Sequence, residues 1–214
     1  MAARLPRKTN AESSAATKNK LLRATQECLI QYGCANTSTK KICERAGISN
    51  GSLLHHYRTR SNLLVATLKY IYQQIDARID QLPRDSGTGS INLKVYVSEL
   101  FDIFNAPEMK AVIELWLAAA NDEEFRSQVL PVMESFSDNL APRVAGYLNL
   151  RSQDMDDVAR TTRHIAIMLA GYGLSLIAFG REQPGESEIR LYLEGTVYNL
   201  LLGVAYEQPD KKLP

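Results

Sequence analysis

The sequence is poor in the residues from which catalytic and metal centres are usually built. Its 214 residues include 3 histidines and 3 cysteines. The cysteine spacings match no zinc-binding pattern, and no secretory signal peptide is recognisable. A Ser-His-Asp set, a cluster of metal ligands and a phosphate-binding loop are also missing. We therefore expect a protein that is not an enzyme and that uses no cofactor and no metal ion.

The three cysteines, Cys28, Cys34 and Cys43, all lie in the amino-terminal third of the chain. An odd number of cysteines without a secretory signal is typical of reduced, mostly buried thiols in a cytoplasmic protein, and a redox-sensing role stays open. His55 and His56 could join Cys43 in a metal site. Neighbouring residues on a helix point about 100° apart, however, and this divergence argues against such a site.

A hydrophobic run long enough to cross a membrane is missing as well. The segment Ile165–Gly180 has 16 residues without a charge, whereas a spanning helix needs about 20 apolar residues. It also contains two glycines, a serine and a tyrosine. We expect a helix that is buried on several sides within protein, and no association with a membrane.

The chain has almost no net charge, but this total hides a strong division. Residues 1–60 carry 11 Lys and Arg against 3 Asp and Glu, a balance of +8, and residues 61–214 carry −7, which together give the formal +1. A basic amino-terminal third beside an acidic remainder indicates a module that binds a polyanion, joined to a body with another task.

The stretch from Thr37 to Leu64 has the pattern of two short helices joined by a tight turn and followed by the start of a third helix. Gly47 stands where the first helix must end, because glycine adopts left-handed conformations without steric cost. Ser38 and Ser49 each supply a side-chain oxygen that can cap the helix that follows. The apolar residues expected to pack these helices together are Ile42, Ala46, Leu53 and Tyr57. This is the pattern of a helix-turn-helix, whose second helix, Asn50 to about His56, fits the DNA major groove.

The remainder of the chain has helical periodicity throughout and no convincing alternating strand, so we expect an all-α fold of about nine helices. Residues 1–16 are polar and rich in alanine and serine, which favours a disordered basic arm. Residues 17–62 form the expected helix-turn-helix DNA-binding domain, and residues 63–214 form a helical domain for ligand binding and dimerisation. The penultimate helix is expected to end near Gly180, and the last helix to begin at Ser187. These two helices favour a homodimer through a four-helix bundle. Monomer core is the alternative role for these two helices.

The segments ATQECLIQYG and TSTKKICERAGISNGSLLHHYRTRSNLL, within residues 17–64, resemble the DNA-binding domain of the tetracycline-repressor (TetR) family. The matching positions are Gly33, Ser38, Ile42, Ala46, Gly47, Ser49, Gly51, Leu53, His56, Tyr57, Arg60, Leu63 and Leu64. The rest of the chain is similar only in architecture. The resemblance implies a homodimeric repressor in the cytoplasm, bound to a palindromic operator in double-stranded DNA and released from it by a small molecule.

The resemblance also implies which residues contact DNA. The side chains placed at the base edges are Lys40, Asn50, Ser52 and His55. Those placed at the phosphates are Ser38, Thr39, His56, Tyr57 and Arg60, with Ser49 at the capped start of the second helix. Lys40 suits the acceptors of guanine, and Asn50 suits adenine. Leu54 departs from the family, which commonly has a tyrosine there for a phosphate, so this contact is lost or Leu54 touches a thymine methyl group instead.

An effector pocket is expected among the aromatic and methionine side chains of the carboxy-terminal domain. The candidates are Tyr96, Phe104, Met109, Trp116, Met133, Phe136, His164, Met168 and Tyr172, which favour a hydrophobic or amphipathic ligand. The same spacing is also typical of plain helix core. A DNA-binding architectural or division-linked protein without a ligand is the alternative function.

Overall fold

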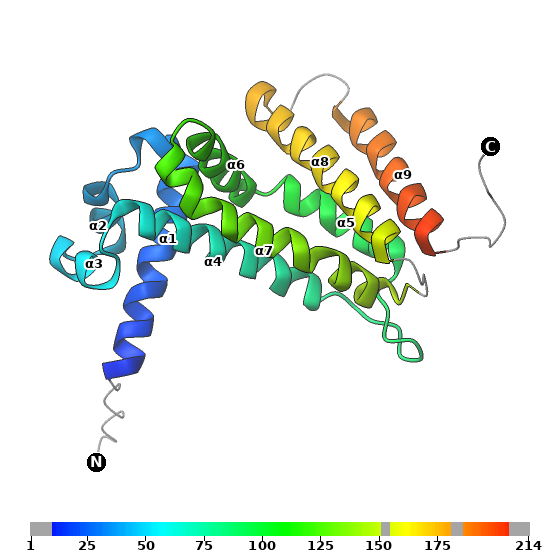
Figure 1. Ribbon diagram of the computed structural model, residues 1–214, viewed down its shortest axis with the longest axis horizontal. Helices are drawn as coiled ribbons and strands as arrows, with labels where there is room; N and C mark the ends of the chain where they lie inside the picture. The colour runs from blue at the N-terminus through cyan, green and yellow to red at the C-terminus, as the bar shows by residue number, and fades with distance from the viewer. Residues whose placement is uncertain (1–9, 151–154, 181–185, 206–214) are drawn as a thin grey trace, which may run out of the picture. The chain divides into compact units, whose positions relative to one another are not determined.

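The computed structural model describes residues 10–150, 155–180 and 186–205. These residues form nine α-helices and no strand beyond one isolated bridge between Arg84 and Ile91 (Figure 1). The predicted all-α fold is therefore confirmed for the described part of the chain. The helices are α1 (Asn10–Asn36), α2 (Thr39–Ala46), α3 (Asn50–His56), α4 (Arg60–Asp80), α5 (Leu93–Phe104), α6 (Pro107–Ala120), α7 (Glu123–Leu148), α8 (Met155–Phe179) and α9 (Glu186–Ala205).

The chain divides into two compact units. The first unit comprises residues up to Ile71 together with Ala111–Val129, and the second comprises Tyr72–Lys110 and the residues from Leu130 onward. Helices α4, α6 and α7 therefore each contribute to both units. The predicted domain boundary at residue 62 lies inside α4, and the sequence did not indicate that part of α6 and α7 joins the first unit.

The predicted arm needs correction at its carboxyl end. Helix α1 begins at Asn10 rather than at Thr17, so residues 10–16 are helical, while residues 1–9 lie outside the described residues. Alanine has the highest intrinsic helix propensity, and Glu12 in the first turn suits the positive end of the helix dipole. The alanine and serine content was therefore wrongly interpreted as a sign of disorder in this segment.

Side-chain caps also open two of the longer helices. Helix α4 is capped by Thr59, whose Oγ1 accepts from the N–H of Asn62 at 3.0 Å. Helix α7 is capped by Asp122, whose Oδ1 accepts from the N–H of Phe125 at 2.9 Å. Each cap satisfies a backbone donor that the first helical turn leaves free.

The core of the first unit joins α1 to the helix-turn-helix. Its buried members are Leu21, Ala24, Cys28, Ile42, Cys43, Leu53 and Leu63. Ala46 and Tyr57 are partly buried against this cluster, which confirms the predicted packing of the two short helices. Helix α3 is thus fixed to this core by Leu53, which is completely buried.

In the second unit, α5, α8 and α9 contact one another, and α8 and α9 lie side by side (Figure 1). Phe101 of α5 faces Tyr172 of α8 with ring centroids 5.5 Å apart. Arg190 of α9 bonds to Asp102 of α5 at 2.9 Å. These contacts hold the carboxy-terminal helix pair onto α5.

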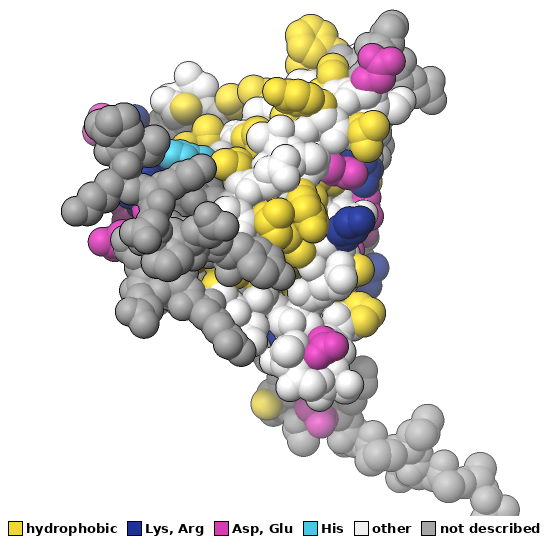
Figure 2. All heavy atoms as spheres, turned by 90° about the vertical axis from the view of Figure 1, so that its right-hand side faces the viewer, with side chains coloured by type: hydrophobic (Ala, Val, Ile, Leu, Met, Phe, Trp, Pro, Cys, Tyr) yellow, Lys and Arg dark blue, Asp and Glu magenta, His cyan; other side chains and the backbone are white. Residues whose placement is uncertain are grey.

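Helix α8 buries only one stripe within the single chain. It is the one described helix long and apolar enough to cross a membrane, and 33% of its most apolar stretch of 18 residues is buried. Core helices of soluble proteins have the same properties, so this finding alone assigns no location. The exposed apolar side chains of α8 and α9 are Met155, Ile167, Leu174, Ile177, Phe179, Ile189, Leu191, Tyr192 and Leu200. Figure 2 shows several clusters of hydrophobic side chains on the face it presents.

Candidate nucleic-acid interface

Helix α2 is defined at both ends by the predicted residues. The Oγ of Ser38 accepts from the N–H of Lys41 at 3.3 Å, which satisfies one donor that the first helical turn leaves free. At the other end, Gly47 adopts the left-handed conformation (φ 64°, ψ 37°), and its N–H returns to the carbonyls of Cys43 and Glu44. The three-residue turn 47–49 is thereby fixed between the two helices.

Helix α3 begins at a second serine cap. The Oγ of Ser49 accepts from the N–H of Ser52 at 3.2 Å. Asn50 and His55 are exposed, and Ser52 is half-buried. The helix therefore presents short polar groups on the side opposite Leu53, as a reading helix requires.

The three cations of α2 have different environments. The side chain of Lys40 is 85% exposed and has a loose ion pair with Glu44 at 4.0 Å. Lys41, in contrast, donates to the carbonyl of Asn36 at 2.9 Å and lies over the ring of Tyr32. Arg45 lies over the same ring and pairs with Glu27 of α1 at 3.5 Å. Lys40 thus makes only a loose contact within α2, whereas Lys41 and Arg45 tie α2 to α1.

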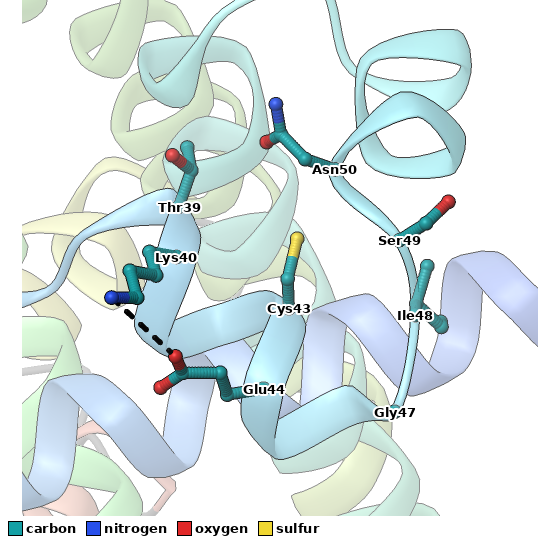
Figure 3. Close-up of a pocket in the computed structure, with 8 residues that line it drawn as sticks. All are labelled: Thr39, Lys40, Cys43, Glu44, Gly47, Ile48, Ser49 and Asn50. Carbon is teal, nitrogen blue, oxygen red and sulfur yellow. Dashed lines mark ion pairs between the residues drawn. The ribbon is translucent and has the colours of Figure 1, made fainter.

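A hollow of about 520 Å³ lies between α2 and α3 (Figure 3). It is lined by Thr39, Lys40, Cys43, Glu44, Gly47, Ile48, Ser49 and Asn50. Lys40 and Glu44 lie together on α2, joined by their ion pair, and Ser49 and Asn50 lie on the segment that leads into α3 (Figure 3). Four of the predicted DNA-contact residues therefore surround one concave surface.

The end of α1 forms a polar junction with α4 and α6 inside the first unit. Gly33 breaks the helical conformation (φ 74°, ψ 169°), and the next N–H, that of Cys34, donates to Oε2 of Glu114 at 2.8 Å. Arg60 donates to the carbonyls of Thr37 at 2.8 Å and Cys34 at 2.5 Å. The guanidinium of Arg60 thus holds the start of α2 against the start of α4. Its predicted phosphate contact stays a prediction.

The remaining predicted phosphate ligands lie at the carboxyl end of α3. Tyr57 caps that helix and packs on the core, and burial raises the pKa of its hydroxyl. His56 is half-buried, and its pKa is lowered first by burial and then by His55 and Lys18. His56 is therefore mainly neutral near pH 7 in the free protein.

The predicted effector-pocket residues lie on four helices, α5 to α8. Tyr96, Met109 and Tyr172 are buried, whereas His164 is exposed. Phe136 stacks on Tyr72 with ring centroids 4.0 Å apart. The other candidates, Phe104, Trp116, Met133 and Met168, are partly buried, and Trp116 belongs to the first unit. The pocket stays a prediction.

All three cysteines are free and buried. Burial is the main cause that raises the pKa of each thiol, which lowers the fraction of reactive thiolate. Within the described residues, no three His, Cys, Asp or Glu side chains are placed to hold a metal ion.

Sequence reasoning missed the partners of Cys34 and of Tyr32. Glu114 lies 80 residues from Cys34 along the chain, and no local pattern connects them. The role of Tyr32 had a weak signal, since Lys41 and Arg45 are four residues apart and so lie on one face of α2.

Comparison with known proteins gives a consistent result. Residues 21–67 match the family model described as bacterial regulatory proteins, tetR family. The chain is 30% identical over 113 residues to the HTH-type transcriptional regulator BetI of Pseudomonas fluorescens, covering 50% of this chain and 56% of that protein. The chain thus spans little more than half the length of this relative.

Two solved structures share the fold over most of the chain. A transcriptional regulator from Rhodococcus sp. Rha1 has a TM-score of 0.70 at 16% identity, covering 89% of this chain and 99% of that one. The multidrug binding protein EbrR complexed with ethidium has a TM-score of 0.64 at 19% identity, covering 86% and 98%. With the capped helix-turn-helix, these findings show that residues 21–67 form the helix-turn-helix module of the tetR family of bacterial regulatory proteins, within a chain that shares the fold of solved transcriptional regulators.

Proposed function

We propose that this protein is a cytoplasmic dimeric repressor that binds a palindromic operator and is released from it by a small molecule. The observation that carries the proposal is the surface between α2 and α3, where an exposed lysine and short polar side chains surround a hollow. The +8 balance of residues 1–60 supports a polyanionic partner.

Base reading is assigned to Lys40, Asn50, Ser52 and His55, and backbone contacts to Ser38, Thr39, Ser49, His56, Tyr57 and Arg60. The exposure of Lys40, Asn50 and His55 supports their assignment. Ser38 and Ser49 already accept bonds within their caps, so their hydroxyl protons are free to donate to phosphate oxygens.

The dimer is assigned to α8 and α9. Isolated exposed apolar residues are ordinary, but a group of them on two adjacent helices marks a protein interface. Ile167, Phe179, Leu191 and Tyr192 are between 65% and 76% exposed. Twofold symmetry would present two recognition helices to half-sites about 34–36 Å apart.

The effector is assigned to the second unit and to a hydrophobic or amphipathic class. Support comes from the apolar character of seven candidates in that unit, namely Tyr96, Phe104, Met109, Met133, Phe136, Met168 and Tyr172, and from the structurally similar EbrR, which was solved with ethidium. His164 would supply a polar group from α8.

Selection of genomic fragments by the purified protein, followed by footprinting, tests the operator. We expect protection of one or a few promoter palindromes. Protection of many dispersed sites would instead establish the architectural role, and no preference over bulk DNA would refute both.

A thermal-shift screen of hydrophobic cations and neutral amphiphiles, followed by operator-release assays on each hit, tests the effector. A ligand that stabilises the protein without releasing DNA would refute its role as inducer.

A further inference from the structure

We propose that Leu54 reads the C5-methyl group of a pyrimidine in the operator, which makes it a specificity-determining residue of this chain. The inference rests on the proposed function, because it needs α3 to enter the major groove. It adds an apolar contact to a reading surface that is otherwise polar.

The position of Leu54 on α3 supports this role. The preceding Leu53 is fully buried in the core, whereas Leu54 is 48% exposed. Successive residues on a helix point about 100° apart, so Leu54 turns away from the core. It also lies one turn after Asn50, on the same side of α3, and Asn50 lines the hollow opposite Lys40. The leucine therefore shares a face with a predicted base-reading residue.

A single exposed leucine is ordinary on a protein surface, so its neighbours matter. Among the described residues of the first unit, two large hydrophobic side chains are exposed, Leu54 and Leu117. The other exposed or half-buried positions of α3 are polar residues or glycine. An aliphatic side chain forms no hydrogen bond with a phosphate or a base. Its favourable contact in the major groove is the C5-methyl group, which thymine carries and cytosine acquires on methylation.

The test removes single methyl groups from the DNA. The operator is first defined by selection from random duplexes with the full-length protein, and each thymine of a half-site is then replaced by deoxyuridine. This exchange deletes the methyl and keeps every hydrogen-bonding group. We expect one position per half-site at which the exchange weakens binding about fourfold, the value for burial of one methyl-sized group. The Leu54→Ala variant should bind the thymine and deoxyuridine operators equally.

Leu117→Ala is the matched control, because Leu117 is 50% exposed and belongs to the same unit; it should keep the wild-type sensitivity to methyl loss. Replacing the sensitive T·A pair by 5-methylcytosine·G or by C·G separates the two methyl sources. If the 5-methylcytosine·G operator binds more tightly than the C·G operator, the methyl group is read on either pyrimidine. If these two operators bind equally, thymine is required. If the protein selects an operator but no deoxyuridine position matters, or if Leu54→Ala stays sensitive, this assignment fails and the repressor proposal survives. If no operator is selected, both fail.

Discussion

The first unit and the carboxy-terminal helices α8 and α9 differ in how many large hydrophobic side chains they expose. Among the described residues, the first unit exposes two large hydrophobic side chains, whereas α8 and α9 alone expose nine. The first unit instead ties its helices with polar contacts around Tyr32 and around the carboxylate of Glu114. The mainly polar surface of the first unit is well solvated and suits a charged partner. The apolar surface of α8 and α9 is unfavourable in water, and its burial against another apolar surface is favourable. This difference supports separate partners, namely DNA for one end and a second copy of the chain for the other.

The largest expected effect comes from placing a charge on the apolar end. Leu191 on α9 is 72% exposed, so Leu191→Glu should leave the single chain folded but disfavour its burial against a second copy. We expect a monomer in sedimentation experiments. Affinity for the palindrome should fall about 100-fold or more, because two linked half-site contacts become independent.

The matched control is Leu117→Glu, which introduces the same charge at a position that is 50% exposed in the first unit. This variant should stay dimeric. If both variants remain dimeric, or if both dissociate, exposed apolar area does not distinguish the two ends and the comparison is wrong.

The next effect concerns the polar junction. Gly33 has φ 74° and ψ 169°, a region open essentially to glycine alone, and a Cβ there would lie 2.9 Å from Oε2 of Glu114. Gly33→Ala should therefore lower the free energy of unfolding by about 3–4 kcal/mol, from backbone strain and from the displaced carboxylate. Chemical denaturation of the dimer and of the Leu191→Glu chain would measure it.

Gly47→Ala provides the control, because Gly47 has φ 64° and no heavy atom within 4 Å of its Cβ position. It should lower the free energy of unfolding by only about 1–2 kcal/mol, the strain of a left-handed residue. In a Glu114→Ala background, Gly33→Ala should be less costly than in the wild type. Equal losses for the two glycine variants would mean that the approach of Glu114 has no energetic weight.

A smaller effect separates two adjacent lysines of α2. Lys40→Ala should reduce discrimination between operator and random DNA by about 1–3 kcal/mol, since its side chain is exposed. Lys41→Ala should mainly lower the free energy of unfolding by about 1 kcal/mol, because it removes a hydrogen bond and a cation–ring contact. Titration of both duplexes with each variant, beside thermal unfolding, checks the pair. A larger loss of discrimination in Lys41→Ala would reverse the assignment.

The contrast between these lysines shows what the sequence could predict. The caps Ser38 and Ser49 and the turn at Gly47 follow from short-range rules, so the helix-turn-helix was predicted correctly. Which lysine ammonium is held by a carbonyl and a ring depends on Asn36 and on Tyr32 of another helix, and periodicity does not show that. The link between Cys34 and Glu114 spans 80 residues and leaves no sequence pattern. The fold was therefore accessible from sequence, whereas the partners of single polar groups were not.

The smallest effect is a dependence on pH at the edge of the DNA-binding surface. Burial, then His55 and Lys18, lower the pKa of His56 in the free protein from its ordinary value of 6.5. A phosphate oxygen beside His56 would raise that pKa in the complex, so binding would take up a proton. Operator affinity should then rise a few-fold as the pH falls from about 8 to about 6. The stability of the free protein should change in the opposite direction, because a lowered folded-state pKa contributes stability that is present above pH 6.5 and lost as the pH falls through the folded pKa. Operator titrations across this range should lose their slope in His56→Gln and keep it in His55→Gln. A slope that survives in His56→Gln would remove His56 from the phosphate contacts and leave the other assigned residues of the DNA-facing end unaffected.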